Sequence, residues 1–312
     1  MRHTAQPAWQ FQGRMEGFLG TQLLVFGPGY SAQPILQKAK GAGWSLFATY
    51  RDAKKRALLE QAGIHAVAFD AQGVGAIDPS KPLHILVSIA PLAKSPEMTE
   101  GDPVLHLWKS WLSQQTNILS ISYLSSTNTY GDHDGAWVDE TTQPNPTLDR
   151  GKRRLVAEKA WENLAKSIET RLFIFRLAGI YGPDRNAFCA LKAGRGRCII
   201  KKNQVFSRIH QTDICATVWA AMNSSHKGGI FNLADDMPTP PHEVIETAAA
   251  MMNIAPPKRE AWKTAELSEM ARSFYLESKR VRNEKIKKEL GVNLVYPTYK
   301  QGLEALFPAD GI

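Results

Sequence analysis

Six short apolar segments recur through the first 180 residues, and they constrain the fold more than any other feature. Several are apolar throughout, as expected when both faces of a parallel sheet are covered. Helical patterns separate them, including residues 52–63, where Asp52 is placed to cap the helix start. This alternation predicts an α/β fold with a doubly wound parallel sheet. The six segments are residues 23–26, 45–50, 65–70, 84–90, 118–126 and 171–178.

The turn after the first segment reads GPGYSA, which is a G-x-G-x-x-A pattern. Gly27 permits a tight turn, Gly29 leaves room for a pyrophosphate, and the small Ala32 lets the next helix approach the strand. The free N–H groups at the start of that helix suit phosphate. We therefore predict that Gly27, Gly29, Tyr30 and Ser31 bind a dinucleotide. The alternative is a turn with a structural role only.

The end of the second segment favours NADP over NAD. NAD sites usually carry Asp or Glu there, to bond the ribose 2′-hydroxyl. This chain has Tyr50 and Arg51 instead, followed by Lys54 and Lys55. A guanidinium pairs bidentately with a 2′-phosphate, so Arg51 is the predicted partner of that group. The neighbouring Asp52 keeps NAD open as the alternative.

The pattern loosens after Tyr181, where prolines gather at 238–241 and 256–257. We expect an N-terminal extension over residues 1–20, a Rossmann domain for the dinucleotide over residues 21–180, and a smaller lobe over residues 181–312. This C-terminal lobe is expected to be mostly helical, to bind the substrate and to send segments back to the sheet.

The net charge of +8 is concentrated in one part of the 312-residue chain. Between Arg150 and Arg208 it carries fifteen basic and four acidic residues, a local excess of +11. Such a field attracts anions, although a solvated helical surface is the alternative. No nucleic-acid module is visible, so we expect no nucleic-acid partner. No apolar run reaches about 18 residues, so we expect no membrane span.

Three cysteines, none in a C-x-x-C pair, indicate a reduced cytoplasmic protein without a metal site. The first twenty residues lack the apolar centre of a secretory signal, which agrees with a cytoplasmic location.

Five segments, in order and at suitable spacing, resemble those of the extended short-chain dehydrogenase/reductase family. The resemblance covers nearly the whole chain and implies a Rossmann domain with a small substrate lobe. It also implies NAD(P)-dependent chemistry of the epimerase/dehydratase or oxidoreductase type, and homodimers. The segments are FGPGYSA (26–32), YLSSTNTYGDHDGAWVDE (123–140), FRLAGIYGP (175–183), SRIHQTDIC (207–215) and KRVRNEKIKKELGVNLVYPTYKQGL (279–303).

The catalytic Tyr-x-x-x-Lys pair of that family is missing from its usual place. Anchoring the helix on Glu158 puts Arg150 and Arg154 at the two positions, and the neighbouring register gives Asp149 and Arg153. An arginine stays protonated and cannot cycle a proton as a phenol does. The glycine pattern is also shorter than the usual G-x-x-G-x-x-G. Both departures indicate an atypical branch.

Two other side chains remain candidates for catalysis. The resemblance matches Ser126 to the family's catalytic serine, whereas its structural alternative is to cap a turn. Tyr130 is expected beside the same cleft, where a cationic cluster would acidify its phenol and make it a proton donor. The alternative is a packed aromatic with a bonded hydroxyl.

The resemblance also implies contacts to the nicotinamide. It assigns Ala178, Gly179 and Ile180, at the end of the sixth segment, to the cofactor. Ser88, within the fourth segment, is assigned to the cofactor with them.

The remaining arginines are predicted to bind an anionic substrate. Arg195 and Arg197 lie in a flexible basic loop, residues 192–204, that suits phosphates or carboxylates. In the family that this chain resembles, the arginine at the position of Arg208 often contacts a substrate phosphate. With Arg150 and Arg154 in place of the proton-cycling pair, all five are substrate-binding candidates.

Two functions of different classes follow from these observations. The first is an NAD(P)-dependent oxidoreductase or epimerase/dehydratase-like enzyme acting on an anionic small molecule, possibly nucleotide-linked. The second is a catalytically inactive NADP(H)-binding sensor or scaffold. Retention of Ser126 and Tyr130 favours the first, and loss of the Tyr-x-x-x-Lys pair favours the second.

Overall fold

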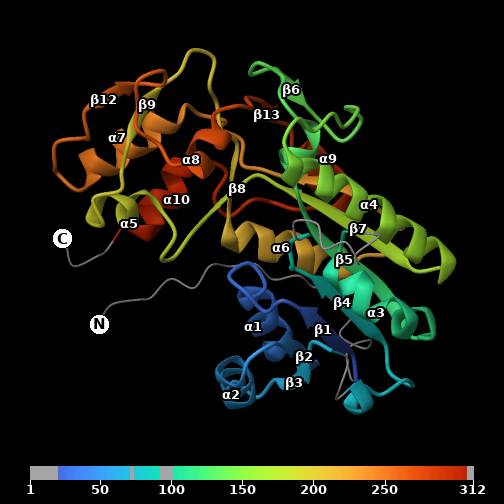
Figure 1. The fold of residues 1–312 in the computed structure, drawn as a ribbon. Helices are drawn as coiled ribbons and strands as arrows, with labels where there is room; N and C mark the ends of the chain where they lie inside the picture. The colour runs from blue at the N-terminus through green and yellow to red at the C-terminus, as the bar shows by residue number, and fades with distance from the viewer. Residues whose placement is uncertain (1–19, 71–73, 92–100, 308–312) are drawn as a thin grey trace.

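A seven-stranded parallel sheet is the centre of the computed structural model, which describes residues 20–70, 74–91 and 101–307 (Figure 1). The strand order is β3-β2-β1-β4-β5-β7-β11, so the direction of winding reverses between β1 and β4. This is a doubly wound Rossmann-type sheet. All six predicted segments form strands, and β11 is a seventh that was not predicted. The strands are β1 (Gln22–Phe26), β2 (Ser45–Tyr50), β3 (His65–Ala68), β4 (Leu83–Val87), β5 (Ile118–Ser126), β7 (Arg171–Leu177) and β11 (Gly228–Leu233).

Helices cover both faces of this sheet, which explains why several of its strands are apolar throughout. In β1, Leu23 packs with the helices of one face, whereas Leu24 packs with those of the other. The first face carries α1 (Gln33–Gly41), α2 (Ala53–Gln61), α6 (Gln211–Met222) and α9 (Glu284–Leu290). The second carries α3 (Pro103–Ser113) and α4 (Asp149–Ser167). As predicted, the Asp52 carboxylate caps α2, accepting from the Lys55 N–H at 2.8 Å.

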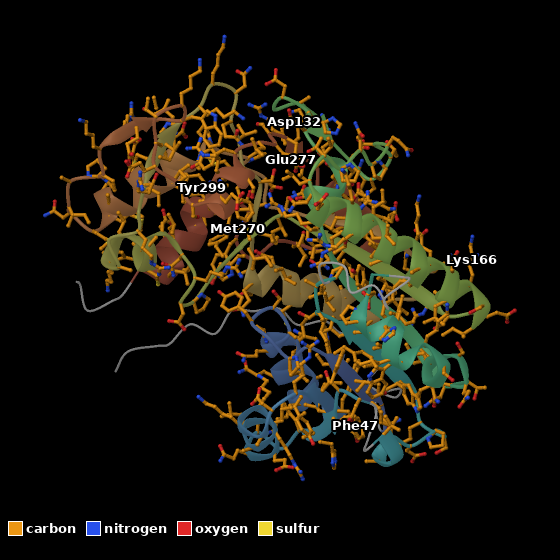
Figure 2. The ribbon with its side chains drawn as sticks, in the orientation of Figure 1. Phe47, Asp132, Lys166, Met270, Glu277 and Tyr299 are labelled. Carbon is orange, nitrogen blue, oxygen red and sulfur yellow. The ribbon has the colours of Figure 1, made fainter. Side chains whose placement is uncertain are left out.

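A smaller lobe lies beyond the carboxyl ends of the strands (Figure 1). Its own core includes Phe188, Ala248 and Tyr299, and Figure 2 shows Tyr299 and Met270 on this side of the molecule and Phe47 in the sheet. Residues after 181 also supply β11, α6 and α9 to the sheet layer. The lobe contains α5 (Ala187–Lys192), α7 (Pro241–Met251), α8 (Glu269–Phe274), α10 (Tyr299–Leu306) and the parallel pair β9 (Cys198–Ile200) with β12 (Arg259–Ala261).

Short elements join the lobe to the sheet. Two further parallel pairs are β8 (Gly179–Tyr181) with β10 (Arg208–His210), and β6 (Trp137–Val138) with β13 (Arg280–Val281). The described residues also include the 3-10 turns η2 (Val74–Ala76), between β3 and β4, and η3 (Thr127–Tyr130), directly after β5. The extension predicted over residues 1–20 lies outside the described residues, apart from Gly20. Across the described ranges, no helix is both long and apolar enough to cross a membrane.

A buried ion pair fixes α4 to the sheet. Arg176 of β7 donates from Nη2 to Glu158 Oε2 of α4 at 2.7 Å, and both side chains are 2% exposed. The hydroxyl of Ser125, in β5, donates to Glu158 Oε1 at 2.5 Å. Three elements therefore meet at one carboxylate. Removing one partner of such a pair leaves an uncompensated buried charge.

We expect Glu158→Gln to lower the free energy of unfolding by about 3–5 kcal/mol, because Arg176 would lose the one carboxylate that it pairs with among the described residues. Urea unfolding followed by circular dichroism measures the change. The matched control is Glu162→Gln, one turn further along α4, which should cost less than about 0.5 kcal/mol. Equal effects of the two changes would contradict the role given to Glu158.

Candidate active site

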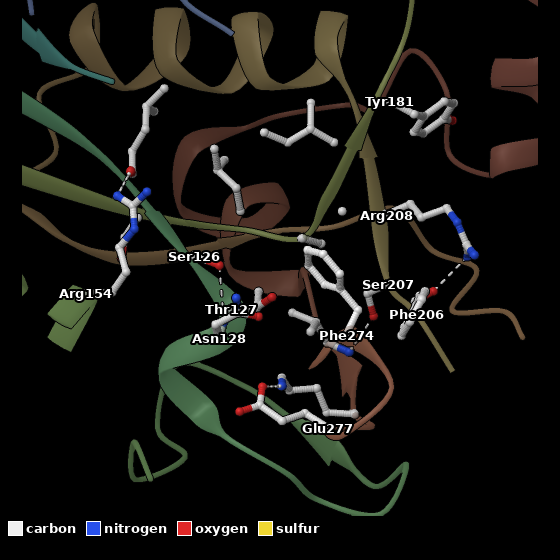
Figure 3. A pocket seen from close by; sticks show the side chains of 18 of the residues that line it. Ser126, Thr127, Asn128, Arg154, Tyr181, Phe206, Ser207, Arg208, Phe274 and Glu277 are labelled. Carbon is white, nitrogen blue, oxygen red and sulfur yellow. Dashed lines mark hydrogen bonds and ion pairs between the residues drawn. The ribbon is translucent and has the colours of Figure 1, made fainter. Parts of the chain in front are cut away.

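A cavity of about 460 Å³ lies at the carboxyl edge of the sheet, between the sheet and the smaller lobe. Ser88 follows β4, Ser126 ends β5 and Leu177 ends β7, and all three line it. The opposite wall comes from the lobe, including Phe274 and Glu277 (Figure 3). In a doubly wound sheet, ligands bind outside the carboxyl ends of the strands where the winding reverses. The cavity is therefore the candidate active site.

The two glycines of the turn after β1 have different roles. Gly27 has a φ of 79°, and a Cβ there would lie 2.6 Å from Ile89 Cγ1, so the fold itself requires a glycine. Its N–H donates to Thr49 Oγ1 at 3.2 Å, which fixes the turn against β2. A Cβ at Gly29 would meet only Gly27 O, at 3.9 Å. Space is therefore left open at Gly29, where the sequence predicted the pyrophosphate.

The start of α1 presents unused donors beside this open space. The backbone N–H groups of Tyr30 and Ser31 make no hydrogen bond to another described residue. Ser31 also lines the cavity. Lys55 Nζ donates to Pro28 O at 2.9 Å, which brings a cation from α2 to the turn. These features fit the phosphates of a dinucleotide.

Tyr30 connects the turn to the smaller lobe. Its hydroxyl donates to Pro183 O at 2.8 Å, just after β8, and its own carbonyl accepts a hydrogen bond from Gln211 Nε2. The guanidinium of Arg185 lies 5.8 Å from the centre of its ring. The turn is thus held from the side of the lobe as well as from the sheet.

Arg51 is exposed at the end of β2, in the position where NAD-binding folds usually carry an acid. Its guanidinium lies 4.6 Å from the centre of the Phe69 ring and forms no ion pair among the described residues. The neighbouring Asp52 is already engaged as the cap of α2. The strand end therefore offers a cation, and not an acid, to the ribose of a dinucleotide.

Residues at the ends of β4, β5 and β7 line the cavity together, as the sequence placed them. Ser88, Ala178, Gly179 and Ile180 all contribute to its wall. Ser126 lines it as well, while its hydroxyl accepts a hydrogen bond from the Asn128 N–H at 3.2 Å and so caps η3. The structure shows the capping role of Ser126 and also brings the residue to the cavity.

Tyr130 does not fit the predicted role of proton donor. It is 0% exposed, does not line the cavity, and donates its hydroxyl proton to Asn232 Oδ1 at 2.8 Å. Burial raises the pKa of the phenol, and the nearby Arg176, 4.8 Å from the ring centre, only partly opposes this. Desolvation therefore outweighs the expected lowering of the Tyr130 pKa by nearby cations. Tyr130 is the packed aromatic of the alternative prediction.

Arg150 and Arg154 both reach the cavity from the first turns of α4. Arg154 Nη1 donates to Leu124 O at 2.7 Å (Figure 3). Arg150 Nη1 donates to Ser273 Oγ at 2.5 Å, and its guanidinium lies 4.4 Å from the centre of the Phe274 ring. Neither Asp149 nor Arg153 lines the cavity, so the register anchored on Glu158 is the one that faces it.

The basic loop does not supply its arginines to the cavity. Arg197 pairs with Glu260 through Nε at 2.7 Å and Nη2 at 2.6 Å, and Arg195 is exposed elsewhere on the surface. Neither residue lines the cavity. These two residues do not reach the candidate active site, and β9, which follows them, pairs with β12 of the lobe. Substrate binding by Arg195 and Arg197 stays a prediction from the sequence.

Arg208, in contrast, lies on the cavity wall, and Arg185 joins it there. Arg208 Nη1 donates to Phe206 O at 2.9 Å and Thr239 O at 3.2 Å, which leaves Nε and Nη2 for a ligand (Figure 3). Burial lowers the pKa of this guanidinium, and the charge of Asp235 opposes the shift. Arg185 was not predicted, although it follows the recognised motif at 175–183 by two residues.

Sequence reasoning also missed a buried ion pair on the lobe side of the cavity. Lys279 Nζ donates to Glu277 Oε2 at 3.0 Å and to Gly131 O at 2.5 Å, and both side chains line the cavity. Burial lowers the pKa of the Lys279 ammonium, and Glu277 opposes the shift. Lys279 begins the C-terminal segment recognised in the sequence, but nothing local marks it as a cavity residue.

Comparisons with known proteins found similar chains among solved structures. No protein-family model matches the chain, and no curated protein matches it. A functionally unknown conserved protein from Silicibacter pomeroyi is 41% identical, with a TM-score of 0.82 over 93% of this chain and 99% of that one.

More distant structures share the fold. A human epimerase family protein solved with NADPH is 16% identical, with a TM-score of 0.68 over 91% of this chain and 98% of its own. UDP-glucose 4-epimerase from Thermotoga maritima, solved with UDP-glucose, is 14% identical, with a TM-score of 0.73 over 91% of this chain and 96% of its own. The chain therefore belongs to one family with the Silicibacter pomeroyi protein, and it shares the fold of these epimerase structures.

Proposed function

We propose that this chain is an NADP(H)-dependent enzyme, of the oxidoreductase or epimerase/dehydratase type, that acts on a small anionic molecule. One observation carries the proposal: a single cavity joins the end of the glycine turn to four arginines without an acid partner among the described residues. They are Arg150, Arg154, Arg185 and Arg208. Homodimer formation and a cytoplasmic location stay predictions from the sequence.

Residues of the glycine turn and of the end of β2 would hold the cofactor. Gly29 provides the open approach, the N–H groups of Tyr30 and Ser31 provide donors, and Arg51 provides the cation at the end of β2. Ser88 and the residues from Ala178 to Ile180 would line the nicotinamide end. When bound, a nicotinamide dinucleotide supplies hydride transfer.

NADP is the proposed form because Arg51 lies at the end of β2, and because the Asp52 carboxylate is already used to cap α2. A guanidinium suits the 2′-phosphate that distinguishes NADP from NAD. The human epimerase family protein of the same fold was solved with NADPH, which supports the choice. A dTDP-glucose 4,6-dehydratase of this fold was solved with NAD, so the fold accommodates either form.

Lys279 is the proposed proton carrier in place of the missing tyrosine. Arginines hold their protons, and burial raises the pKa of Tyr181, a phenol that does line the cavity, above its usual value. Lys279 has a pKa lowered by burial and lies within hydrogen-bonding distance of Glu277. Lys279 lines the cavity, and its ammonium group can donate a proton. The lowered pKa makes this proton easier to release, as general acid catalysis requires.

The second candidate function is a cofactor-binding sensor or scaffold without turnover. The observation in its favour is that Arg150 and Arg154 are already held by protein groups, through Ser273 and Leu124. Arg150 and Arg154, at the two positions where the family has its Tyr-x-x-x-Lys pair, would then have a structural role. Cofactor binding is common to both functions, and only turnover separates them.

Gly29→Val tests the cofactor site itself. We expect this variant to lose binding of NADPH and NADH, because its side chain fills the space that a Cβ finds open at Gly29. Its urea midpoint should stay near that of the wild type. Fluorescence titration with each cofactor measures binding. Gly27→Ala is the structural comparison, and it should be destabilised because its Cβ would meet Ile89. Normal binding by Gly29→Val would refute the site.

Arg51→Ala tests the choice between cofactors. Loss of a charge-assisted contact should weaken NADPH binding by about 1.5–3 kcal/mol and leave NADH binding nearly unchanged. The matched control is Arg56→Ala in α2, five residues after Arg51, whose guanidinium pairs with Glu60 at 2.8 Å. Titration of both cofactors with all three proteins measures the difference. Equal losses for NADPH and NADH in Arg51→Ala would rule out a 2′-phosphate contact.

Lys279→Gln tests turnover, measured as NADPH oxidation over a panel of carbonyl compounds and nucleotide sugars. With any member that the wild type converts, we expect kcat to fall by about 10²–10⁴-fold, as for loss of a general acid, while NADPH still binds. Lys202→Gln, an exposed lysine outside the cavity, is the control. Unchanged kcat would refute the role of Lys279. Tight NADPH binding without any wild-type turnover would favour the sensor.

A further inference from the structure

A second cavity of about 290 Å³ opens beside the first. The two share Ile180, Tyr181, Arg185 and Arg208, so the pair of arginines lies where the cavities meet. The second cavity extends from this junction into the smaller lobe, between α5, α7 and α10. A ligand in the first cavity therefore has a second compartment within reach.

The walls of the second compartment are mostly apolar. Ala190 of α5, Val244 and Ile245 of α7, and Leu303 of α10 line it. Asn186 also lines it, but its amide is already used: Nδ2 donates to Gly182 O at 2.9 Å, and Oδ1 accepts from the Cys189 N–H at 3.0 Å. No carboxylate or uncommitted side-chain amide among the lining residues is available to bond a nucleotide base. An apolar group suits this compartment better.

The junction, by contrast, suits an anion. Arg208 uses only Nη1 in hydrogen bonds to the described residues, and Arg185 is exposed. Neither forms an ion pair with a described acid. Asp235 is the acid whose charge acts on Arg208, but one of its carboxylate oxygens accepts from the Met237 N–H, at 3.1 Å. Two arginines that line the same junction favour a carboxylate or phosphate.

We propose that the substrate is an amphipathic anion. Its charged group lies between Arg185 and Arg208, and its apolar chain or ring enters the compartment of Ala190, Val244, Ile245 and Leu303. This proposal rests on the proposed function, because it takes the first cavity as the place of reaction. It narrows the substrate from any anion to one with an apolar end, in place of a nucleotide base.

The test is calorimetric titration with a homologous series: butanoate, hexanoate and octanoate. Each added CH2 group that enters the compartment should tighten binding about fourfold. UMP is the nucleotide probe, and it should bind more weakly than octanoate. A flat series, or UMP binding more tightly than octanoate, would overturn the proposal.

Ala190→Phe fills the compartment and should remove the dependence on chain length without weakening NADPH binding. The matched control is Ala250→Phe, at an exposed position of α7 outside both cavities. Val244→Gln is the second variant if Ala190→Phe is misfolded by circular dichroism, and it should reduce the gain per CH2. A chain-length dependence that survives in a folded variant would overturn the assignment of this compartment.

Failure of this proposal is distinguishable from failure of the proposed function. NADPH binding with a flat carboxylate series would remove the apolar subsite and leave the cofactor site in place. A chain-length dependence without NADPH binding would leave the subsite and remove the proposed enzyme function.

Discussion

The buried pair of Glu158 and Arg176 is the interaction on which the candidate active site depends. Arg150, Arg154 and Glu158 are spaced four residues apart and therefore share one face of α4. Anchoring Glu158 between β5 and β7 turns that face toward the carboxyl edge of the sheet. The contacts of Glu158 therefore orient the helix so that Arg150 and Arg154 line the cavity. A charge pair of this kind is costly to bury, and its geometry fixes the helix rotation.

The cavity combines parts that come from opposite walls. The sheet side contributes strand ends and the two arginines of α4, while the lobe side contributes Glu277, Lys279 and Arg208. Loss of the tyrosine from the sheet side does not remove every titratable group from the cavity. It moves the candidate proton carrier to the lobe, whose position relative to the sheet then matters for chemistry. Tyr30 contributes to that position through its bond to Pro183.

Much of the fold followed from the sequence because its signals are local. The apolar segments became strands, and Asp52 capped the helix that follows it. β11 was missed, since it lies after residue 180, where the regular alternation had ended. The register of α4 was left open between Arg150 and Asp149, and packing of Glu158 decided it. Arg195 and Arg197 lie outside the cavity, because the strand that follows them, β9, pairs with β12 of the lobe.

The sequence by itself determined the doubly wound sheet, the glycine turn, the basic end of β2 and the absence of a Tyr-x-x-x-Lys pair. Each depends on residues close together in the chain. Only the tertiary structure decided that Tyr130 is buried against Arg176 and Asn232. It also decided that Lys279 lines the cavity, where it bonds Gly131, a residue 148 positions earlier in the chain. The physical reason is that desolvation and cavity lining depend on distant elements packing together, and neither leaves a local pattern.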